Sequence, residues 1–416
     1  MAHLIIKNVG PIKNVDIELN KVNIIMGPQS SGKSTIAKIV SFCSWLDKSM
    51  AKKETKDFSE GINNGGYFKL LQDYHRLSGS YFTIDSVIDY NGAHISFKIK
   101  KDNPNQLRCT IGFHDLQRGE ASKVIYIPAE RNFVSVVPNL KKYAEDKDNL
   151  QDFIQNWYEA KRKYSADNKL SILDLGVEYF NTESEDIDRL VLTNGNELQL
   201  RVASSGLQSL VPLITLIDYL ARGIYNESRP ISVEERDLLI KEYNSLVDKR
   251  NSGDKSIDKN HLLTLLDMLV SRDYHYSQFI IEEPEQNLFP STQRDLMYYI
   301  LHAMLLNEKH TMLITTHSPY ILYALNNCMM GYLVKDKMPE AEKNEVSCRN
   351  SWINPELVSV WEIKDGELRT TAESRNNTIQ GEDGLISDNY FDENMKEVMD
   401  DFYKMLNYYG DDKDED

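Results

Sequence analysis

Short apolar runs and turn residues alternate over the first fifty positions of the chain. Residues 4–6 and 15–19 lie on either side of Gly10-Pro11, which predicts two antiparallel strands joined by a turn. A continuous apolar run at 22–26 predicts a buried strand, and a Gly/Ser-rich loop follows at 27–32. The next apolar residues recur at helical spacing and predict a helix over 34–48: Ile36, Ile39, Val40, Cys43 and Leu46.

The rest of the chain continues this mixture of strands and helices. The expected elements are, in order, strands within 80–128, polar helices over 139–190, an apolar helix over 207–222, polar helices over 228–272, and strands at 279–281 and 312–314. Pro212 could kink the apolar helix or delay its start. The acidic residues after Gly410 are typical of a frayed, solvated terminus. Together these elements predict an α/β fold.

Composition excludes several classes of protein. Hydrophobic residues make up 41% of the chain and charged residues 27%, which is ordinary for a soluble globular protein. The net charge of −16 argues against a surface coated with nucleic acid, although a local basic groove is compatible with it. No apolar run approaches a membrane span, and the first residues resemble a strand rather than a signal peptide. We therefore expect a cytoplasmic protein, no membrane contact and reduced thiols; the four cysteines lie far apart, without a zinc-site spacing.

The strongest motif is the loop between the buried strand and the first helix. Residues 27–34 fit the pattern G-x-x-x-x-G-K-[ST], in which backbone N–H groups and a helix N-terminus surround phosphate oxygens. The expected nucleotide-binding residues are Gly27, Gln29, Ser30, Ser31, Gly32, Lys33, Ser34 and Thr35. Lys33 would reach the β- and γ-phosphates, Ser34 would bind Mg²⁺, and Thr35 could bond the α-phosphate. A chance match is disfavoured by the strand before the loop and the helix after it.

A second motif is the pair of carboxylates that ends the apolar strand at 279–281. In a protein with such a phosphate loop, this strand lies beside the loop. We assign Glu282 to the metal side and Glu283 to the general base. The alternative is an exposed acidic turn. Because the first acid of this motif is usually Asp, the longer Glu282 predicts an outer-sphere metal contact and slow hydrolysis.

Two further candidate phosphate-contacting sites lie at the end of a predicted strand and at the start of a predicted helix. His317, just after the strand at 312–314, could donate to the γ-phosphate and sense it, although a lone histidine there is more often structural. Residues 203–209 begin the apolar helix, where Ser204 or Ser205 would be a natural N-cap. The functional interpretation is a second helix N-terminus that binds phosphate.

These motifs, in this order, resemble the ATP-binding-cassette class of P-loop ATPases: Walker A at 27–35, signature at 204–209, Walker B at 279–283 and the switch histidine His317. The resemblance implies an ABC-ATPase head, with a RecA-like P-loop core, an antiparallel β subdomain and a helical signature lobe with inserted helices. It also implies ATP and Mg²⁺ as ligands. In that class two heads sandwich ATP, so the protein would be a homodimer or a higher homo-oligomer.

Several residues take their expected roles from this resemblance alone. Ser204, Ser205, Gly206 and Gln208 of one protomer would act in trans on the nucleotide of the other, and Asn287 would lie in a loop at the dimer seam. The implied division is an N-terminal ATPase lobe at 1–128, a helical signature lobe at 129–272, the second half of the core at 273–330, and a mixed C-terminal segment at 331–416.

The branch of the class is indicated by two short segments. Asn8–Lys13 resembles the SMC-like branch, which includes RecF and the overcoming-lysogenization-defect (OLD) proteins, and the long interval from Ser205 to Glu283 is unlike a transporter cassette. Residues 126–132 resemble the Pro-Ala-Glu-Arg element of OLD-like ATPases in bacterial defence operons. Glu130 and Arg131 could lie near the nucleotide or the dimer seam, or Arg131 could form a structural ion pair.

The end of the chain shows no recognisable TOPRIM nuclease motif. The resemblance is therefore to the separate ATPase subunits of anti-phage systems, with PARIS ahead of Septu. These subunits work with a separate effector, often a nuclease, and respond to a trigger such as DNA or a phage protein. The alternative is a RecF-like repair ATPase that binds DNA directly.

Two groups of basic residues could contact a nucleic-acid backbone. The first, on a predicted strand pair, comprises Lys98, Lys100, Lys101 and Arg108. The second is Lys161-Arg162-Lys163 on a predicted helix, near Trp157 and Tyr158. A solvated surface would show the same pattern.

Overall fold

The computed structural model describes residues 2–50, 66–103, 106–114, 122–138, 140, 148–182, 184–223, 240, 243–247, 274–370 and 376–409. The polar helices expected over 228–272, apart from a short helical stretch at 243–247, and the acidic tail after Gly410 lie outside these residues.

An 11-stranded sheet runs through the molecule in the order β6-β5-β4-β1-β2-β15-β14-β3-β13-β12-β7. One part is parallel and consists of β14 (Val358–Lys364), β3 (Val22–Met26), β13 (Thr311–Thr316), β12 (Tyr276–Glu282) and β7 (Ser122–Ile127). Their carboxyl ends meet at one edge, where ligands bind in such sheets. The predicted strands at 22–26, 279–281 and 312–314 are confirmed as neighbours in this core.

The other part of the sheet is antiparallel. It contains β1 (Ala2–Val9), β2 (Ile12–Leu19), β4 (Phe82–Asn91), β5 (Ile95–Asn103) and β6 (Gln106–Phe113). The short strand β15 (Glu367–Leu368) joins it to β14. The hairpin predicted around Gly10-Pro11 is confirmed, and the parallel core with an antiparallel subdomain confirms the expected α/β fold.

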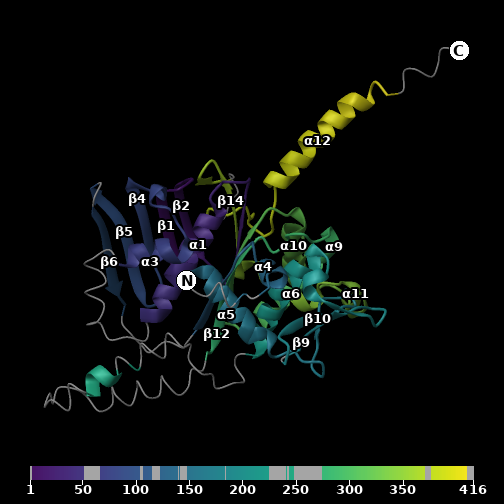
Figure 1. Ribbon diagram of the computed structural model, residues 1–416. Helices are drawn as coiled ribbons and strands as arrows, with labels where there is room; N and C mark the ends of the chain where they lie inside the picture. Colours follow the sequence, from purple (N-terminus) through teal and green to yellow (C-terminus); the bar gives the residue numbers. More distant parts are fainter. Residues whose placement is uncertain are drawn as a thin grey trace.

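Helices cover both faces of the parallel strands, and the alternation of strand side chains explains why. On β3, Ile24 packs into one apolar cluster and Ile25 into the other, because successive strand residues point to opposite faces. The first cluster includes α5 (Asn149–Lys161), α6 (Ser205–Asp218), α9 (Pro290–Leu305) and α10 (Pro319–Val334). The second includes α1 (Lys33–Met50) and α3 (Gly66–His75). Figure 1 shows the antiparallel strands and α6, α9 and α10 at opposite ends of the molecule.

The prediction of helices throughout 139–190 is correct for α5 and wrong beyond it. Residues after α5 form a four-stranded sheet of β8 (Leu170–Ser171), β9 (Glu178–Thr182), β10 (Ile187–Val191) and β11 (Glu197–Gln199). Turns with positive φ at Gly176 and Gly195 separate these strands. The aromatic and β-branched residues of this stretch favour strands, a local preference that the many charged residues concealed.

The helix predicted at 207–222 is confirmed as α6, which continues through Pro212 without ending. The remaining short elements are η1 (Gly79–Tyr81), α4 (Phe133–Val136), η3 (Leu200–Val202), η4 (Tyr219–Gly223), α11 (Glu340–Glu345), η6 (Arg349–Ser351) and η7 (Pro355–Leu357). In the described part of the chain no helix is both long and apolar enough to span a membrane.

The C-terminal segment is not a separate layer. β14 pairs with β3 along its length, from Val358 opposite Val22 to Glu362 opposite Met26. The segment expected at 331–416 therefore completes the core beside the phosphate loop. Its last helix, α12 (Tyr390–Leu406), projects away from the body of the molecule (Figure 1).

Candidate functional site

The phosphate loop connects β3 to α1, as the motif predicts. Gly27 has a φ of +146° and Gly32 a φ of +106°, conformations that residues with a side chain rarely adopt. A Cβ atom on Gly27 would lie 2.3 Å from the carbonyl oxygen of Ile363 on β14. The loop therefore needs glycine at this position both for its backbone conformation and for its close packing on β14.

Lys33 lies at the start of α1 and is only 5% exposed. Its Nζ atom donates to the carbonyl oxygens of Gly27 and Pro28, at 2.8 Å each. Burial lowers the pKa of Lys33 to about 8, while the charges of Glu283 and Glu285 oppose this. Ser31 Oγ is buried without a hydrogen-bond partner among the described residues. The loop thus has donors placed for an anion, which an ATP phosphate group would fit.

Glu282 is the last residue of β12 and is 5% exposed. Burial raises its pKa, and the nearby hydroxyls of Tyr126 and Ser34 lower it. Within the described residues, its Oε1 atom has no hydrogen-bond partner. A buried carboxylate oxygen without a partner, close to the Ser34 hydroxyl, fits the pair of residues expected on the metal side.

A Mg²⁺ ion at this position would need further oxygen ligands. No group of three or more His, Cys, Asp or Glu side chains that could hold a metal occurs in the described part of the chain. Mg²⁺ commonly binds one or two protein ligands, several waters and substrate phosphates, so Ser34 and Glu282 are a sufficient protein contribution.

Glu283 and His317 lie next to each other, although they follow different strands. Glu283 Oε1 is 3.5 Å from His317 Nε2, and Gln286 Nε2 donates to Glu283 Oε2 at 2.9 Å. The contact with His317 is the largest cause that lowers the pKa of Glu283 to about 2, with Gln286 and Lys33 adding to it and burial opposing it. Glu283 is therefore an ionised carboxylate at neutral pH, as a general base must be.

The backbone holds Glu283 in an unusual conformation. Its φ is +42°, which is uncommon for a residue with a side chain, and its N–H donates to the carbonyl of Thr315 on β13 at 2.9 Å. Such conformations persist where the surroundings impose them, often at functional sites. The turn after β12 thus directs Glu283 toward the histidine that follows β13.

Glu285 belongs to the site but was not predicted. Its Oε1 accepts a hydrogen bond from the His317 backbone N–H at 2.6 Å, whereas Oε2 is buried without a partner among the described residues. Burial raises the pKa of Glu285. The run Glu282-Glu283-Pro284-Glu285 signals it in the sequence, but only the pairing of β12 with β13 shows that it positions His317.

Arg131 is fully buried and contacts backbone carbonyls rather than a carboxylate. Its guanidinium donates to the carbonyl oxygens of Pro128, Ser209, Glu282, Glu283 and Pro284, at 2.9 to 3.3 Å. Burial lowers its pKa to about 10, while the three nearby glutamates oppose this. Arg131 thus connects α6 to the turn that carries Glu283. Glu130, beside it, is exposed.

The signature segment packs against the turn after β12 of its own chain. Ser204 is the N-cap of α6, and its Oγ accepts from the Leu207 N–H at 3.4 Å. Asn287 Nδ2 donates to Ser209 Oγ at 3.0 Å, and a Cβ atom on Gly206 would lie 2.9 Å from the Asn287 carbonyl oxygen. Gln208 Nε2 donates to the carbonyl of Arg201 at 2.9 Å. The signature segment, which forms the N-cap and first turn of α6, and the predicted seam residue Asn287 are therefore neighbours.

Of the basic residues at 161–163, Lys161 at the end of α5 is not available to nucleic acid, whereas Arg162 is exposed. Lys161 is 3% exposed and its Nζ lies 2.7 Å from Asp186 Oδ1 and 3.4 Å from Asp188 Oδ2. Asp188 also accepts from the Tyr179 hydroxyl at 2.7 Å. The expectation that Lys161 could contact DNA is wrong, because its charge is neutralised between α5 and the small sheet.

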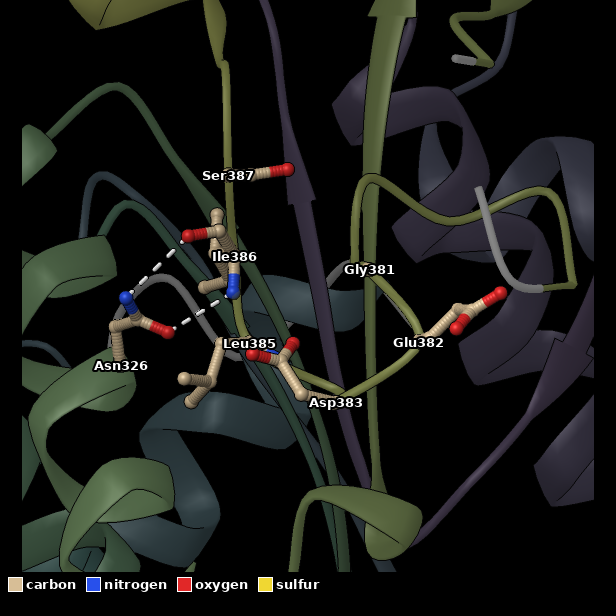
Figure 2. A pocket seen from close by; sticks show the side chains of 7 residues that line it. All are labelled: Asn326, Gly381, Glu382, Asp383, Leu385, Ile386 and Ser387. Carbon is tan, nitrogen blue, oxygen red and sulfur yellow. Dashed lines mark hydrogen bonds between the residues drawn. The ribbon is translucent and has the colours of Figure 1, made fainter. Parts of the chain in front are cut away.

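A pocket of about 640 Å³ lies elsewhere, between Asn326 of α10 and residues 381–387 (Figure 2). Asn326 hydrogen-bonds both the N–H and the carbonyl of Ile386. Glu382 and Asp383 give this pocket a negative charge, which would repel the phosphates of a nucleotide. The phosphate loop, not this pocket, is the candidate site.

Comparisons with solved structures give matches of low sequence identity. The chain is similar to the SMC head domain from Thermotoga maritima, with a TM-score of 0.34 and 11% identity over 77% of this chain and 90% of that chain. An ATP-binding cassette, solved as a dimer in a post-hydrolysis state with ADP and phosphate, matches with a TM-score of 0.31 and 13% identity over 89% of this chain and 97% of that chain. No curated protein matches the chain.

A family model described as an AAA domain matches residues 3–288. This range is more than half of the 416 residues and extends from β1 to the turn after β12, so it contains both Lys33 and Glu283. The chain therefore belongs to the AAA-domain family.

Proposed function

We propose that this chain is an ATPase whose protomers pair around ATP and that acts as a sensor or scaffold in bacterial anti-phage defence, where it controls a separate nuclease effector. The observation that carries the ATPase part is the convergence of Lys33, Glu282, Glu283 and His317 at the carboxyl ends of β3, β12 and β13. These side chains come from segments far apart in the sequence, and the Glu283 carboxylate has the charge that a general base requires.

The residues divide the work of hydrolysis. Lys33 and the loop backbone would hold the β- and γ-phosphates, and Ser34 and Glu282 would hold Mg²⁺, which when bound would neutralise developing charge on the phosphates. Glu283 accepts a proton from the attacking water, while His317, fixed through its backbone by Glu285, donates to the γ-phosphate. The longer side chain of Glu282, at a position where Asp is usual, supports slow turnover.

Pairing of protomers is supported by the surface around the signature segment. Val202, just before it, is 67% exposed, and Phe289, just after the Asn287 turn that packs on Gly206, is 74% exposed. Both residues flank the contact between Gly206 and Asn287, so a second protomer seated on this contact would cover them. A second protomer that covers them would place Ser205 and Gly206 against its own nucleotide.

The defence role rests on the resemblance of residues 126–132 to OLD-like ATPases. PARIS-like systems fit best, with Septu-like systems as the alternative, because a small OLD-like ATPase without long arms is expected in the former. A DNA or phage-protein trigger and the nuclease effector are parts of the same proposal.

A RecF-like function in direct DNA binding is favoured by one feature. Lys100 on β5 is paired directly with Arg108 on β6, and both are exposed. Like charges at opposite positions destabilise a strand pair unless an anion neutralises them. Salt-dependent DNA binding that is lost on Lys100→Glu with Arg108→Glu would mark this second function.

ATP turnover by the purified protein tests the ATPase proposal. We expect Lys33→Ala to abolish ATP binding, and Glu283→Gln to bind ATP while turnover falls at least ~100-fold, in line with the loss of a general base. Glu367→Gln, an exposed change on β15, should turn over ATP like the wild type. If Glu283→Gln is as active as the wild type, the assignment of the base is wrong; if Lys33→Ala is as active, the ATPase proposal itself fails.

A further inference from the structure

Among the described residues, the projecting helix α12 contacts the body at its N-terminal end alone. Asn389, which is 2% exposed, caps the helix by accepting from the N–H groups of Phe391 and Asp392. Arg369 pairs with both Glu362 and Glu393, and the Tyr390 N–H donates to Glu362. The root of the helix is therefore held by a buried cap and an ion-pair network, and the direction in which the helix leaves the body is set.

Beyond this root α12 is exposed on all sides. None of its 17 residues is buried, and Figure 1 shows it well away from the sheet and the other helices. Its apolar residues recur every three or four positions and form an apolar stripe along one face: Met395, Val398, Phe402 and Met405. Met395, Val398 and Met405 are each more than 60% exposed.

An uncovered stripe of this kind is unfavourable in water. A helix of this length is marginally stable on its own, and most helical stability in proteins comes from packing of the apolar face. The polar face does not supply that stability, because the ion pair described beyond the root, between Lys404 and Asp401, joins two side chains that are each more than 70% exposed. The stripe therefore requires a cover from outside the described part of this chain.

The charge of α12 indicates which kind of molecule could cover its apolar stripe. Five acidic residues and two lysines lie within α12, and the whole chain has a net charge of −16. A second acidic α12 alongside, an anionic membrane surface and a nucleic-acid backbone would all be repelled. A protein groove that is apolar at its centre and lined by Lys or Arg at its rim would be attracted.

We propose that α12 is a docking helix for a protein partner that presents an apolar groove rimmed by basic residues. The helix inserts its apolar stripe into the groove, and its acidic flanks contact the rim. This inference rests on the proposed function in that the partner is the separate effector. Its site, however, lies on α12 and shares no residue with the nucleotide site.

Co-purification with the product of the neighbouring gene is the test. Co-expression of that protein with the full chain shows whether the two form a complex. Titration calorimetry of the two separately purified proteins then measures the dissociation constant. We expect the wild type to form a complex, and Val398→Glu with Phe402→Glu to weaken it at least 100-fold. Lys404→Glu is the matched control, because it changes the net charge by the same two units on the opposite face, and it should bind like the wild type.

The outcomes separate this inference from the ATPase proposal. If the stripe variant binds the partner as the wild type does, or if the wild type does not bind it, α12 is not the docking helix. If the mass of the free wild type corresponds to a dimer that Val398→Glu with Phe402→Glu dissociates, the cover is a second copy and the inference is wrong. ATP turnover should be unchanged in the stripe variant, so a failure of the ATPase proposal would appear only in turnover.

Discussion

At the scale of single residues, the site is built from groups whose charge states are set by their neighbours. Lys33 is held against Gly27 and Pro28, Glu282 is buried with one free oxygen, and Glu283 faces His317. Lys33 and the two adjacent acids could be assigned from the sequence, because their roles are encoded in short contiguous motifs. The position of Glu285 under His317 could not, because it depends on the pairing of two strands.

The pH dependence of stability tests the Glu283 environment. The pKa of Glu283 is about 2 in the folded protein, below the ordinary value of 4.5, so ionised Glu283 stabilises the fold above pH 4.5. This contribution, at most about 3 kcal/mol at ~1.4 kcal/mol per pKa unit, is lost as the pH falls from 4.5 toward 2. In urea denaturation the destabilisation caused by Glu283→Gln should therefore be larger at pH 6 than at pH 3. An equal effect at both values would show that His317 does not hold the carboxylate ionised.

At the scale of elements, the described strands and helices of the core were largely predictable, and the small sheet of the signature lobe was not. Apolar runs between turn residues identify β3, β12 and β13, because buried parallel strands are continuously apolar. Residues 170–199 form short strands in which charged residues are paired internally, so their pattern resembled that of a solvated helix. The strand β14 escaped prediction because its place beside β3 comes only from long-range pairing.

Arg131 is the contact that joins two of these elements. Arg131→Ala would remove the guanidinium hydrogen bonds to the buried carbonyl groups of Ser209, Glu282 and Pro284, and each hydrogen bond from a charged group contributes about 1.5–3 kcal/mol. We expect the free energy of unfolding to fall by at least about 3 kcal/mol. Chemical denaturation measures it, with the exposed neighbour change Glu130→Ala as the control. A loss below 1 kcal/mol would mean that the turn after β12 keeps its conformation without Arg131.

At the scale of the whole molecule, two surfaces point outward from one rigid sheet. The signature segment with Val202 and Phe289 faces outward beside the turn after β12, while α12 leaves the body at Asn389. The order of motifs predicted the first surface. No local sequence pattern predicts that the other described residues leave the apolar stripe of α12 exposed, because that depends on the tertiary packing of the whole chain.

The mass of the Glu283→Gln protein in solution, with and without ATP and Mg²⁺, tests the central claim most directly. This variant should bind ATP and stall before hydrolysis, so light scattering should show the mass at least doubling when ATP and Mg²⁺ are added. Lys33→Ala should show no such change. A Glu283→Gln protein that binds ATP and keeps the same mass would contradict the claim that ATP is held between protomers.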